Sequence, residues 1–335
     1  MKSYFFILVI LLCFCTSCKN EKKADTNSIE KELPLHNKRV LILGNSITQH
    51  GGYVDFMEYY LRTHYPDNQL DIISIGLSGE TISGTSESGR DFPRPNVRKR
   101  LDSALHIIKP EVVLACYGMN DGNYHPLDSL RFEAYKKGIL ELKTKVETHG
   151  AQLILMTPTV FDPNPIENRV SKAGEPYEYW HPYYKYNDVL TVYSNWLLNL
   201  ETEALHVVNL HHHLDSILTT MKRIKSDSTF VPDGVHPNKI GHFYMAKKIL
   251  NDIYPEITIE NPNLEIERLK DNSLYELIRK RRELRSEGWR NYVGYTKNGD
   301  TIKSDDISSV KAEVELLDDE IHSLTIRLPR PSSSQ

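Results

Sequence analysis

The sequence has few cysteines, no excess of basic residues and no long apolar segment. Only four of its 335 residues are cysteine, with three of them in the first 18 positions. This scarcity leaves no disulfide framework and no zinc-binding spacing. The 41 basic residues are outnumbered by 45 acidic ones, giving a net charge of -4, which argues against a nucleic-acid-binding protein. No internal repeat is present.

The main apolar run, residues 4–14, follows Lys2 and precedes Cys15-Thr16-Ser17-Cys18. A basic start, a short apolar stretch and small residues before a cleavage point are typical of a secretory signal. The run is too short to span a bilayer. Thr16-Ser17 before Cys18 resembles a bacterial lipobox, although Cys15 stands where that motif usually has Leu. We predict that residues 1–17 are a lipoprotein signal peptide and that Cys18 is lipidated. A plain secretory signal is the alternative.

Residues 18–37 are predicted to form a polar tether, because residues 19–31 are charged and nearly free of apolar side chains. We therefore expect an exported protein of the cell envelope, anchored by lipid to a bacterial membrane, on either the periplasmic or the surface face. The remaining cysteine, Cys116, lies in an apolar run, where a lone cysteine usually acts as a small hydrophobic residue.

Five short apolar runs alternate with amphipathic helical patterns over residues 38–255. This alternation predicts βαβ units and a parallel sheet, with right-handed crossovers placing helices on both faces. The expected fold is a three-layer α/β/α domain with five parallel strands in flavodoxin-like order. The expected strands are residues 39–43, 70–75, 112–116, 153–157 and 205–210. The expected helices are residues 52–65, 97–108, 129–148, 184–200 and one ending near 253.

Residues 256–335 form a distinct, strongly charged extension, predicted to be a helical hairpin with a polar tail. Helical patterns cover residues 264–287 and 308–327, and Asn298-Gly299 between them is a signal for a type I′ β-turn. We expect the hairpin to pack on the main domain or on a second subunit, which would make a homo-oligomer. A substrate lid and a docking site for a partner protein are the alternatives.

Ser46 follows the first predicted strand, in Gly44-Asn45-Ser46-Ile47-Thr48. A strand that turns sharply into a helix there would raise the hydroxyl above the sheet edge, where helix N–H groups favour negative charge. Capping of the helix by Ser46 is the simpler alternative. Asp233 and His236 follow the fifth strand and can share a face. The carboxylate can then orient the imidazole, which takes the serine proton in acyl transfer.

The tetrahedral intermediate of acyl transfer needs hydrogen-bond donors for its oxyanion. Three donors follow predicted strands, at the carboxyl edge where open parallel sheets bind ligands. They are the backbone N–H of Ser46, the backbone N–H of Gly76 and the side-chain amide of Asn120. Each residue alone could be a cap or a turn, but their joint placement favours a site.

At these residues the sequence resembles the SGNH/GDSL hydrolase family. The Ser46 segment is similar to its first block, Ile75-Gly76-Leu77-Ser78-Gly79 to its second, Gly118-Met119-Asn120-Asp121 to its third and Asp233-Gly234-Val235-His236-Pro237 to its fifth. The resemblance covers about residues 38–254. Asn45 replaces the Asp of the family name, and Ser74 stands where an Asn often precedes the second block.

The resemblance implies Ser46 as nucleophile, His236 as base and Asp233 as its orienting acid, with Ser46, Gly76 and Asn120 forming the oxyanion hole. It implies no metal and no cofactor. Residues 158–186 hold many aromatics, of which Tyr179 and Trp180 are predicted to stack on sugar rings or, alternatively, to cover the core. His211-His212-His213 is predicted to begin a helix or lie in a loop rather than to bind a shared metal.

We therefore expect a serine esterase that removes O-acyl groups from a carbohydrate through an acyl-enzyme, with acetyl as the favoured group. A lipase or lysophospholipase is disfavoured because no long apolar lid is present, and a methylesterase acting on uronic acids stays open. The alternative from another class is a non-catalytic glycan-binding or partner-docking protein of the same fold. The expected partners are an acylated carbohydrate and, through the lipid alone, a membrane.

Overall fold

The computed structural model describes residues 33–172, 174, 176–259 and 261–328. The chain divides into two compact units, Met1–Leu33 and Pro34–Gln335, and all elements named below belong to the second. The predicted signal peptide, Cys18 and most of the predicted tether lie outside the described residues. No helix in the described ranges is both long enough and apolar enough to cross a membrane.

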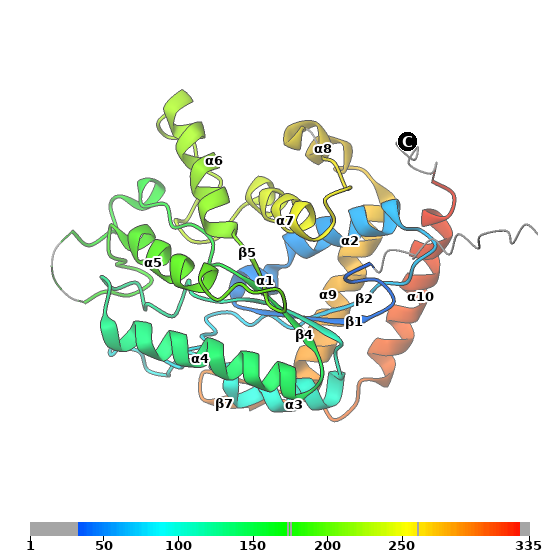
Figure 1. The fold of residues 1–335 in the computed structure, drawn as a ribbon, viewed down its shortest axis with the longest axis horizontal. Coiled ribbons are helices and arrows are strands. Elements are labelled where there is room, and N and C mark those ends of the chain that lie inside the picture. Colours follow the sequence, from blue (N-terminus) through cyan, green and yellow to red (C-terminus); the bar gives the residue numbers. More distant parts are fainter. Residues whose placement is uncertain (1–32, 173, 175, 260, 329–335) are drawn as a thin grey trace, which may run out of the picture. The chain divides into compact units, whose positions relative to one another are not determined.

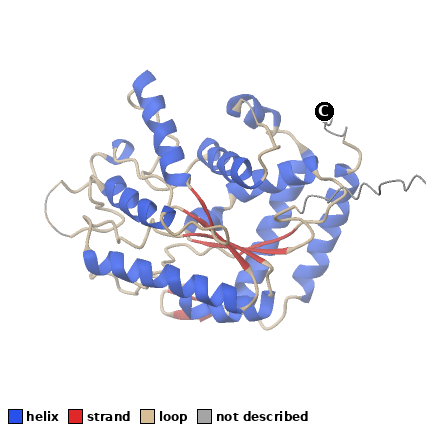
Figure 2. Cartoon of the chain, in the orientation of Figure 1, coloured by secondary structure: helices blue, strands red, loops and turns tan. Residues whose placement is uncertain are grey.

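The central sheet confirms the predicted three-layer α/β/α fold. Its order is β2-β1-β3-β4-β5 with every pair parallel, which is the predicted flavodoxin-like order. Figure 2 shows the strands, in red, surrounded by helices. The inner residues of the strands are mostly apolar, as expected where helices cover both faces of a sheet. Their bounds are β1 Arg39–Gly44, β2 Asp71–Ser74, β3 Val112–Cys116, β4 Gln152–Met156 and β5 His206–Val208.

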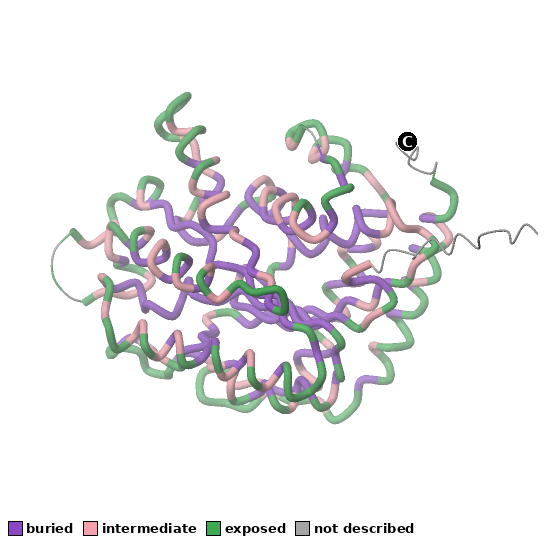
Figure 3. The backbone as a smooth tube through the Cα atoms, in the orientation of Figure 1, coloured by how far each residue is buried: buried purple, intermediate pink, exposed green. Residues whose placement is uncertain are grey.

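Helices cover both faces of the sheet. Leu41 and Leu43 of β1 belong to a buried cluster with side chains of α3 and α4, whereas Phe56 of α2 packs on Phe243 of α7 at 5.1 Å. Figure 1 shows α2 and α7 on one side of the sheet and α3 and α4 on the other, and Figure 3 shows the buried strands between them. The bounds are α2 Gly52–His64, α3 Arg98–Ile108, α4 Ser129–Thr148, α5 Tyr186–Leu198 and α7 Lys239–Ile253.

The structure differs from the expected elements in three places, although a helix after Ser46 and a helix start at His211-His212-His213 were among the expectations. A separate short helix, α1 Ser46–His50, begins directly after β1, and a 3₁₀ turn, η1 Asn164–Ile166, lies in the loop after β4. The fifth predicted strand is also too long, because Leu210 begins α6 Leu210–Ile224. The buried residues Leu210, Leu214 and Leu218 recur at helical spacing and were the missed signal.

The C-terminal extension packs on the main domain, which is one of the two arrangements expected from the sequence. The predicted helix 264–287 is two helices, α8 Pro262–Arg268 and α9 Ser273–Val293, because Asn272 caps the second. The β-hairpin is present as β6 Tyr295–Lys297 and β7 Asp300–Ile302, and α10 Ser308–Thr325 follows. Asn298 and Gly299 both have positive φ, as a type I′ turn requires. Pairing of these helices with a second copy stays a prediction.

Buried ion pairs attach α9 to α2. Arg282 binds the carboxylate of Asp55, and Arg281 binds that of Glu58 at 3.1 Å, with all four side chains at most 5% exposed. A buried charge is costly unless it is paired, and these pairs join the two helices; Arg281 also pairs with Asp318, a residue of the C-terminal extension, at 2.7 Å. The hydrophobic pattern of α9 is weak because much of its buried face is arginine rather than aliphatic.

Candidate active site

The turn from β1 into α1 presents the Ser46 hydroxyl. The side chain of Asn45 accepts a hydrogen bond from the N–H of Ile47 at 3.0 Å and so caps α1. Capping of the helix by Ser46 itself is therefore wrong. Gly44 permits the tight turn, because a Cβ there would lie 2.2 Å from Oγ1 of Thr48. The hydroxyl is left free to bind another partner.

Ser46, His236 and Asp233 form a continuous chain of hydrogen bonds. Ser46 Oγ lies 2.8 Å from Nε2 of His236, and Nδ1 of His236 lies 2.6 Å from Oδ2 of Asp233. Nδ1 faces a carboxylate, so it carries the proton and leaves Nε2 to accept from the serine O–H. The structure thus brings together the three residues that the sequence predicted, across 190 positions of the chain.

Asp233 is held in its ionised form by the segment that carries it. Its Oδ1 accepts the backbone N–H groups of Val235 at 2.9 Å and His236 at 2.7 Å. Partial burial alone would raise the pKa of Asp233, but the hydrogen bonds to His236 and Val235 outweigh it and hold that pKa well below its usual value. The carboxylate therefore stays charged and can stabilise an imidazolium.

Tyr179 contacts Asp233, the carboxylate that binds His236. Its hydroxyl donates to Oδ2 of Asp233 at 3.2 Å, and its ring packs on that of Tyr124 at 5.7 Å. Burial, followed by the charge of Asp233, raises the pKa of Tyr179. Sequence reasoning missed this contact, because the two residues are 54 positions apart.

Trp180 offers an exposed aromatic surface beside the same segment. Its side chain is 60% exposed, and the guanidinium of Arg169 lies 5.4 Å from the ring centre. Arg169 also donates to the backbone carbonyl of Asp233 at 3.3 Å. The tryptophan is therefore linked to Asp233 through Arg169, but it is not among the residues that line the groove described below.

Gly76 lies against the helix that carries Ser46. A Cβ at Gly76 would lie 2.4 Å from the backbone nitrogen of Gln49, so a side chain cannot be accommodated. The N–H groups of Ile75 and Leu77 donate to β1, to Ile42 and Gly44, each at 3.0 Å. The N–H of Gly76 has no acceptor in the described part of the chain. It is thus available, as an oxyanion donor must be.

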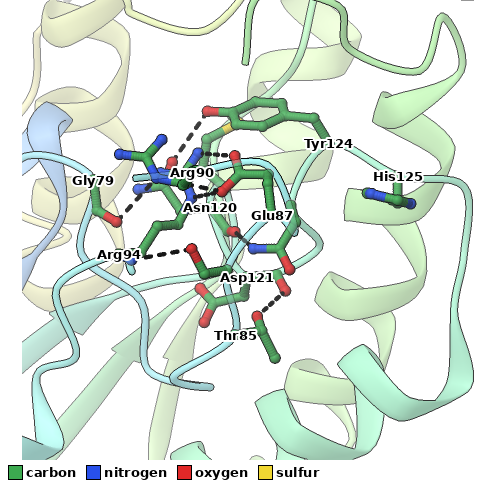
Figure 4. A network of polar contacts seen from close by, with 12 residues as sticks. Gly79, Thr85, Glu87, Arg90, Arg94, Asn120, Asp121, Tyr124 and His125 are labelled. Carbon is green, nitrogen blue, oxygen red and sulfur yellow. Dashed lines mark hydrogen bonds and ion pairs between the residues drawn. The ribbon is translucent and has the colours of Figure 1, made fainter. Parts of the chain in front are cut away.

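Asn120 is fixed by a buried polar network (Figure 4). Its Oδ1 accepts from the hydroxyl of Tyr124 at 3.0 Å, and its Nδ2 donates one hydrogen to the carbonyl of Glu80 at 3.1 Å. The second hydrogen of Nδ2 remains for an oxyanion. Asp121 joins the loops after β2 and β3 by accepting the N–H groups of Ile82 at 2.9 Å and Gly118 at 2.8 Å.

Arg94 and Arg100, which lie before and within α3, are buried ion-paired residues. Arg94 is paired with Glu87 and Arg100 with Glu80, and all four side chains are at most 5% exposed. Arg94 also donates to the carbonyl of Gly79 at 3.3 Å (Figure 4). These two arginines therefore stiffen the loop after β2 and do not form an open anion-binding surface.

A groove opens over Ser46 and His236. Sequence reasoning missed His50 and His242, whose rings stack at 4.8 Å in its wall. Burial, with smaller effects from His50 and Arg282, lowers the pKa of His242 to about 3, so it is neutral. The lining residues are Ser46, Ile47, Gln49, His50, Ser78, Pro232, Asp233, His236, Pro237 and His242.

The three consecutive histidines begin α6 and are absent from the groove lining. His211 is buried and bonded to Thr191 at 2.8 Å, which is a structural contact. Within the described ranges, no group of three or more His, Cys, Asp or Glu residues could hold a metal ion.

Fold and site define a serine hydrolase with its nucleophile at the carboxyl edge of a parallel sheet. Residues 42–242 match the model of the GDSL-like lipase/acylhydrolase family, which is more than half of the chain. The chain therefore belongs to that family and is a serine hydrolase of carboxylic esters. All five predicted catalytic and oxyanion residues lie within the matched range. No curated protein matches its sequence.

Two solved structures show the same fold at low identity. A gut microbial diltiazem-metabolizing enzyme is 19% identical, with a TM-score of 0.50 over 66% of this chain and 48% of its own. This chain thus spans about half of that enzyme. Axe2, an acetylxylan esterase from Geobacillus stearothermophilus, is 19% identical, with a TM-score of 0.50 over 67% of this chain and 98% of its own.

Proposed function

We propose that the protein is an esterase that removes O-acyl groups, acetyl in the first place, from a carbohydrate. The hydrogen-bonded chain from Ser46 through His236 to Asp233 carries this proposal. His236 takes the Ser46 proton as Oγ attacks the ester carbonyl, and it then gives that proton to the departing sugar hydroxyl. Water, activated by the same imidazole, releases the acid and frees Ser46.

The oxyanion formed in each step would be bound by the N–H groups of Ser46 and Gly76 and by the Asn120 amide. Loss of one such donor typically costs about 2.7–4 kcal/mol of transition-state stabilisation. The free N–H of Gly76 and the unused hydrogen on Nδ2 of Asn120 support this assignment.

Exposed Trp180, whose neighbours Arg169 and Tyr179 both contact Asp233, supports a carbohydrate as the leaving group, because an aromatic face can stack on a sugar ring. The fold shared with an acetylxylan esterase is consistent with this substrate class. Two measurements test it. We expect hydrolysis of p-nitrophenyl acetate to exceed that of the octanoate, and Trp180→Ala to slow release of acetate from acetylated polysaccharides while sparing p-nitrophenyl acetate. A preference for long acyl chains would favour a lipase instead.

We also propose export and lipid attachment at Cys18. The order of Lys2, the apolar run and Thr16-Ser17-Cys18 supports this proposal. Replacement of Cys18 by Ala should release the protein from the membrane fraction of the cells that express it. An unchanged membrane fraction in this variant would contradict the anchor.

A further inference from the structure

Helix α9 of the C-terminal extension reaches the loop that carries Gly76. Nη1 of Arg290 donates to the backbone carbonyl of Gly76 at 3.2 Å, across 214 positions of the chain. Figure 1 shows α9 beside α2 and β2. The family match ends at residue 242, so this contact comes from a part of the chain that the family model does not include.

The neighbouring peptide is held by a second arginine. Nη2 of Arg100, in α3, donates to the carbonyl of Ile75 at 2.7 Å. That carbonyl belongs to the same peptide as the N–H of Gly76, and in a trans peptide the two groups point in opposite directions. Arg100 therefore aims the Gly76 N–H away from itself. A hydrogen bond to the carbonyl also polarises the peptide and strengthens its N–H as a donor.

The two arginines differ in how their charge is balanced. Arg100 forms two 2.7 Å hydrogen bonds with the carboxylate of Glu80. Arg290 is 9% exposed and has no ion pair with any carboxylate in the described ranges. Burial, and to a smaller degree Arg100, lowers the pKa of Arg290, whereas Tyr295 and Glu287 favour its charged form. The guanidinium of Arg290 is compensated only in part, by Tyr295 and Glu287, and it binds the loop where an oxyanion would form.

Helix α9 also contacts the helix of the nucleophile. A Cβ at Gly51, the residue that ends α1, would lie 2.5 Å from Nη1 of Arg282. At the C-terminal end of α9, the carbonyl of Val293 accepts a hydrogen bond from the hydroxyl of Ser103 in α3 at 3.2 Å. Helix α9 thus lies close to both α1 and α3. Its Arg290 contacts Gly76, in the loop after β2.

We propose that the C-terminal extension completes the oxyanion hole, with Arg290 of α9 and Arg100 of α3 holding the two peptides that flank Gly76. Arg290 is a positioning residue, which acts through Gly76 and adds a positive charge near the developing oxyanion. This inference rests on the proposed esterase function, because the Gly76 N–H has a role only if an oxyanion forms.

The test compares Arg290→Met with Arg285→Met in the full chain. Arg285 lies on the same helix and is similarly buried, but it pairs with Asp71, which keeps a second partner in Arg39. We expect Arg290→Met to lower kcat for p-nitrophenyl acetate by about tenfold or more, with KM within about twofold of the wild type. Arg285→Met should leave both constants unchanged, and Arg290→Lys should restore part of kcat because it keeps the charge.

Hydrogen exchange of the peptide covering residues 74–79 supplies a readout that does not depend on turnover. Arg290→Met should speed this exchange and Arg285→Met should not. Wild-type kcat and exchange in Arg290→Met would overturn the inference, as would an equal loss of kcat in Arg285→Met. If the wild-type chain hydrolyses no ester, the proposed function fails, and exchange alone then decides whether Arg290 holds the loop.

Discussion

Asp233 holds His236 through both of its carboxylate oxygens. Oδ2 binds the ring at Nδ1, 2.6 Å away, while Oδ1 binds the backbone N–H of the same residue at 2.7 Å. The acid and the base are only three residues apart, so one turn of the chain fixes the ring, its tautomer and its distance from Ser46. The geometry of the base therefore depends mainly on a local segment, and that of the nucleophile on β1.

Replacement of Asp233 by Asn should leave the fold intact and remove most of the activity. The amide cannot stabilise an imidazolium and favours the wrong tautomer of His236. We expect kcat to fall on the order of 10³–10⁴-fold. Steady-state kinetics with p-nitrophenyl acetate measure this loss, and circular dichroism checks the fold. A variant with near wild-type kcat would show that the carboxylate is not needed.

The hydroxyl of Tyr179 should contribute to kcat through Asp233. Tyr179→Phe removes one hydrogen bond to a charged group, worth about 1.5–3 kcal/mol, part of which water can replace. We expect a decrease of about tenfold in kcat/KM. Tyr183→Phe is the matched control, because Tyr183 lies in the same loop and its hydroxyl makes no hydrogen bond to the described residues. Equal effects of the two changes would argue against a role for Tyr179.

Gly76→Ala should abolish most activity, because the added methyl group would collide with the backbone of α1 at Gln49. Either the loop or α1 must move, which displaces an oxyanion donor or the nucleophile. The expected loss in kcat is about 10²–10³-fold. Gly89→Ala serves as the control, since a Cβ there meets no atom within 4 Å. Full activity in the Gly76 variant would exclude a tight fit at this position.

Glu58 should stabilise the attachment of α9 in a pH-dependent way. Burial alone would raise the pKa of Glu58, but Arg281 and Arg62 outweigh it and hold that pKa below its ordinary value of 4.5. The ionised form is thus favoured in the folded state, so its contribution is complete above pH 4.5 and is lost as the pH falls further. Glu58→Gln should cost at most about 3–5 kcal/mol at pH 7, because Arg281 and Arg62 lose the buried carboxylate that they share and keep only the partly exposed Asp318.

Denaturant unfolding at two pH values measures this effect. The difference in unfolding free energy between wild type and Glu58→Gln should shrink as the pH falls below 4.5. A difference that stays constant with pH would show that Glu58 is not ionised in the folded protein.

Local patterns in the sequence predicted the sheet order, the Asn298-Gly299 turn and the residues of the triad. Each depends on short apolar runs, turn residues or a motif at a strand end. The contacts of α9 with α2 could not be predicted, because they involve Arg281 and Arg282, whose acidic partners lie more than 200 positions away. The sequence indicates Tyr179 as an aromatic residue near the site, but its contact with Asp233 depends on the path of the whole loop.

The most direct test of the central claim is whether Ser46 becomes acylated. The protein should be mixed with a p-nitrophenyl ester or a fluorophosphonate and digested, and the Ser46 peptide should be examined by mass spectrometry. We predict that Ser46 carries the acyl or phosphonyl group, that His236→Ala slows its formation and that Ser46→Ala hydrolyses no ester. Turnover that persists in Ser46→Ala, or a label on another residue, would contradict the proposed nucleophile.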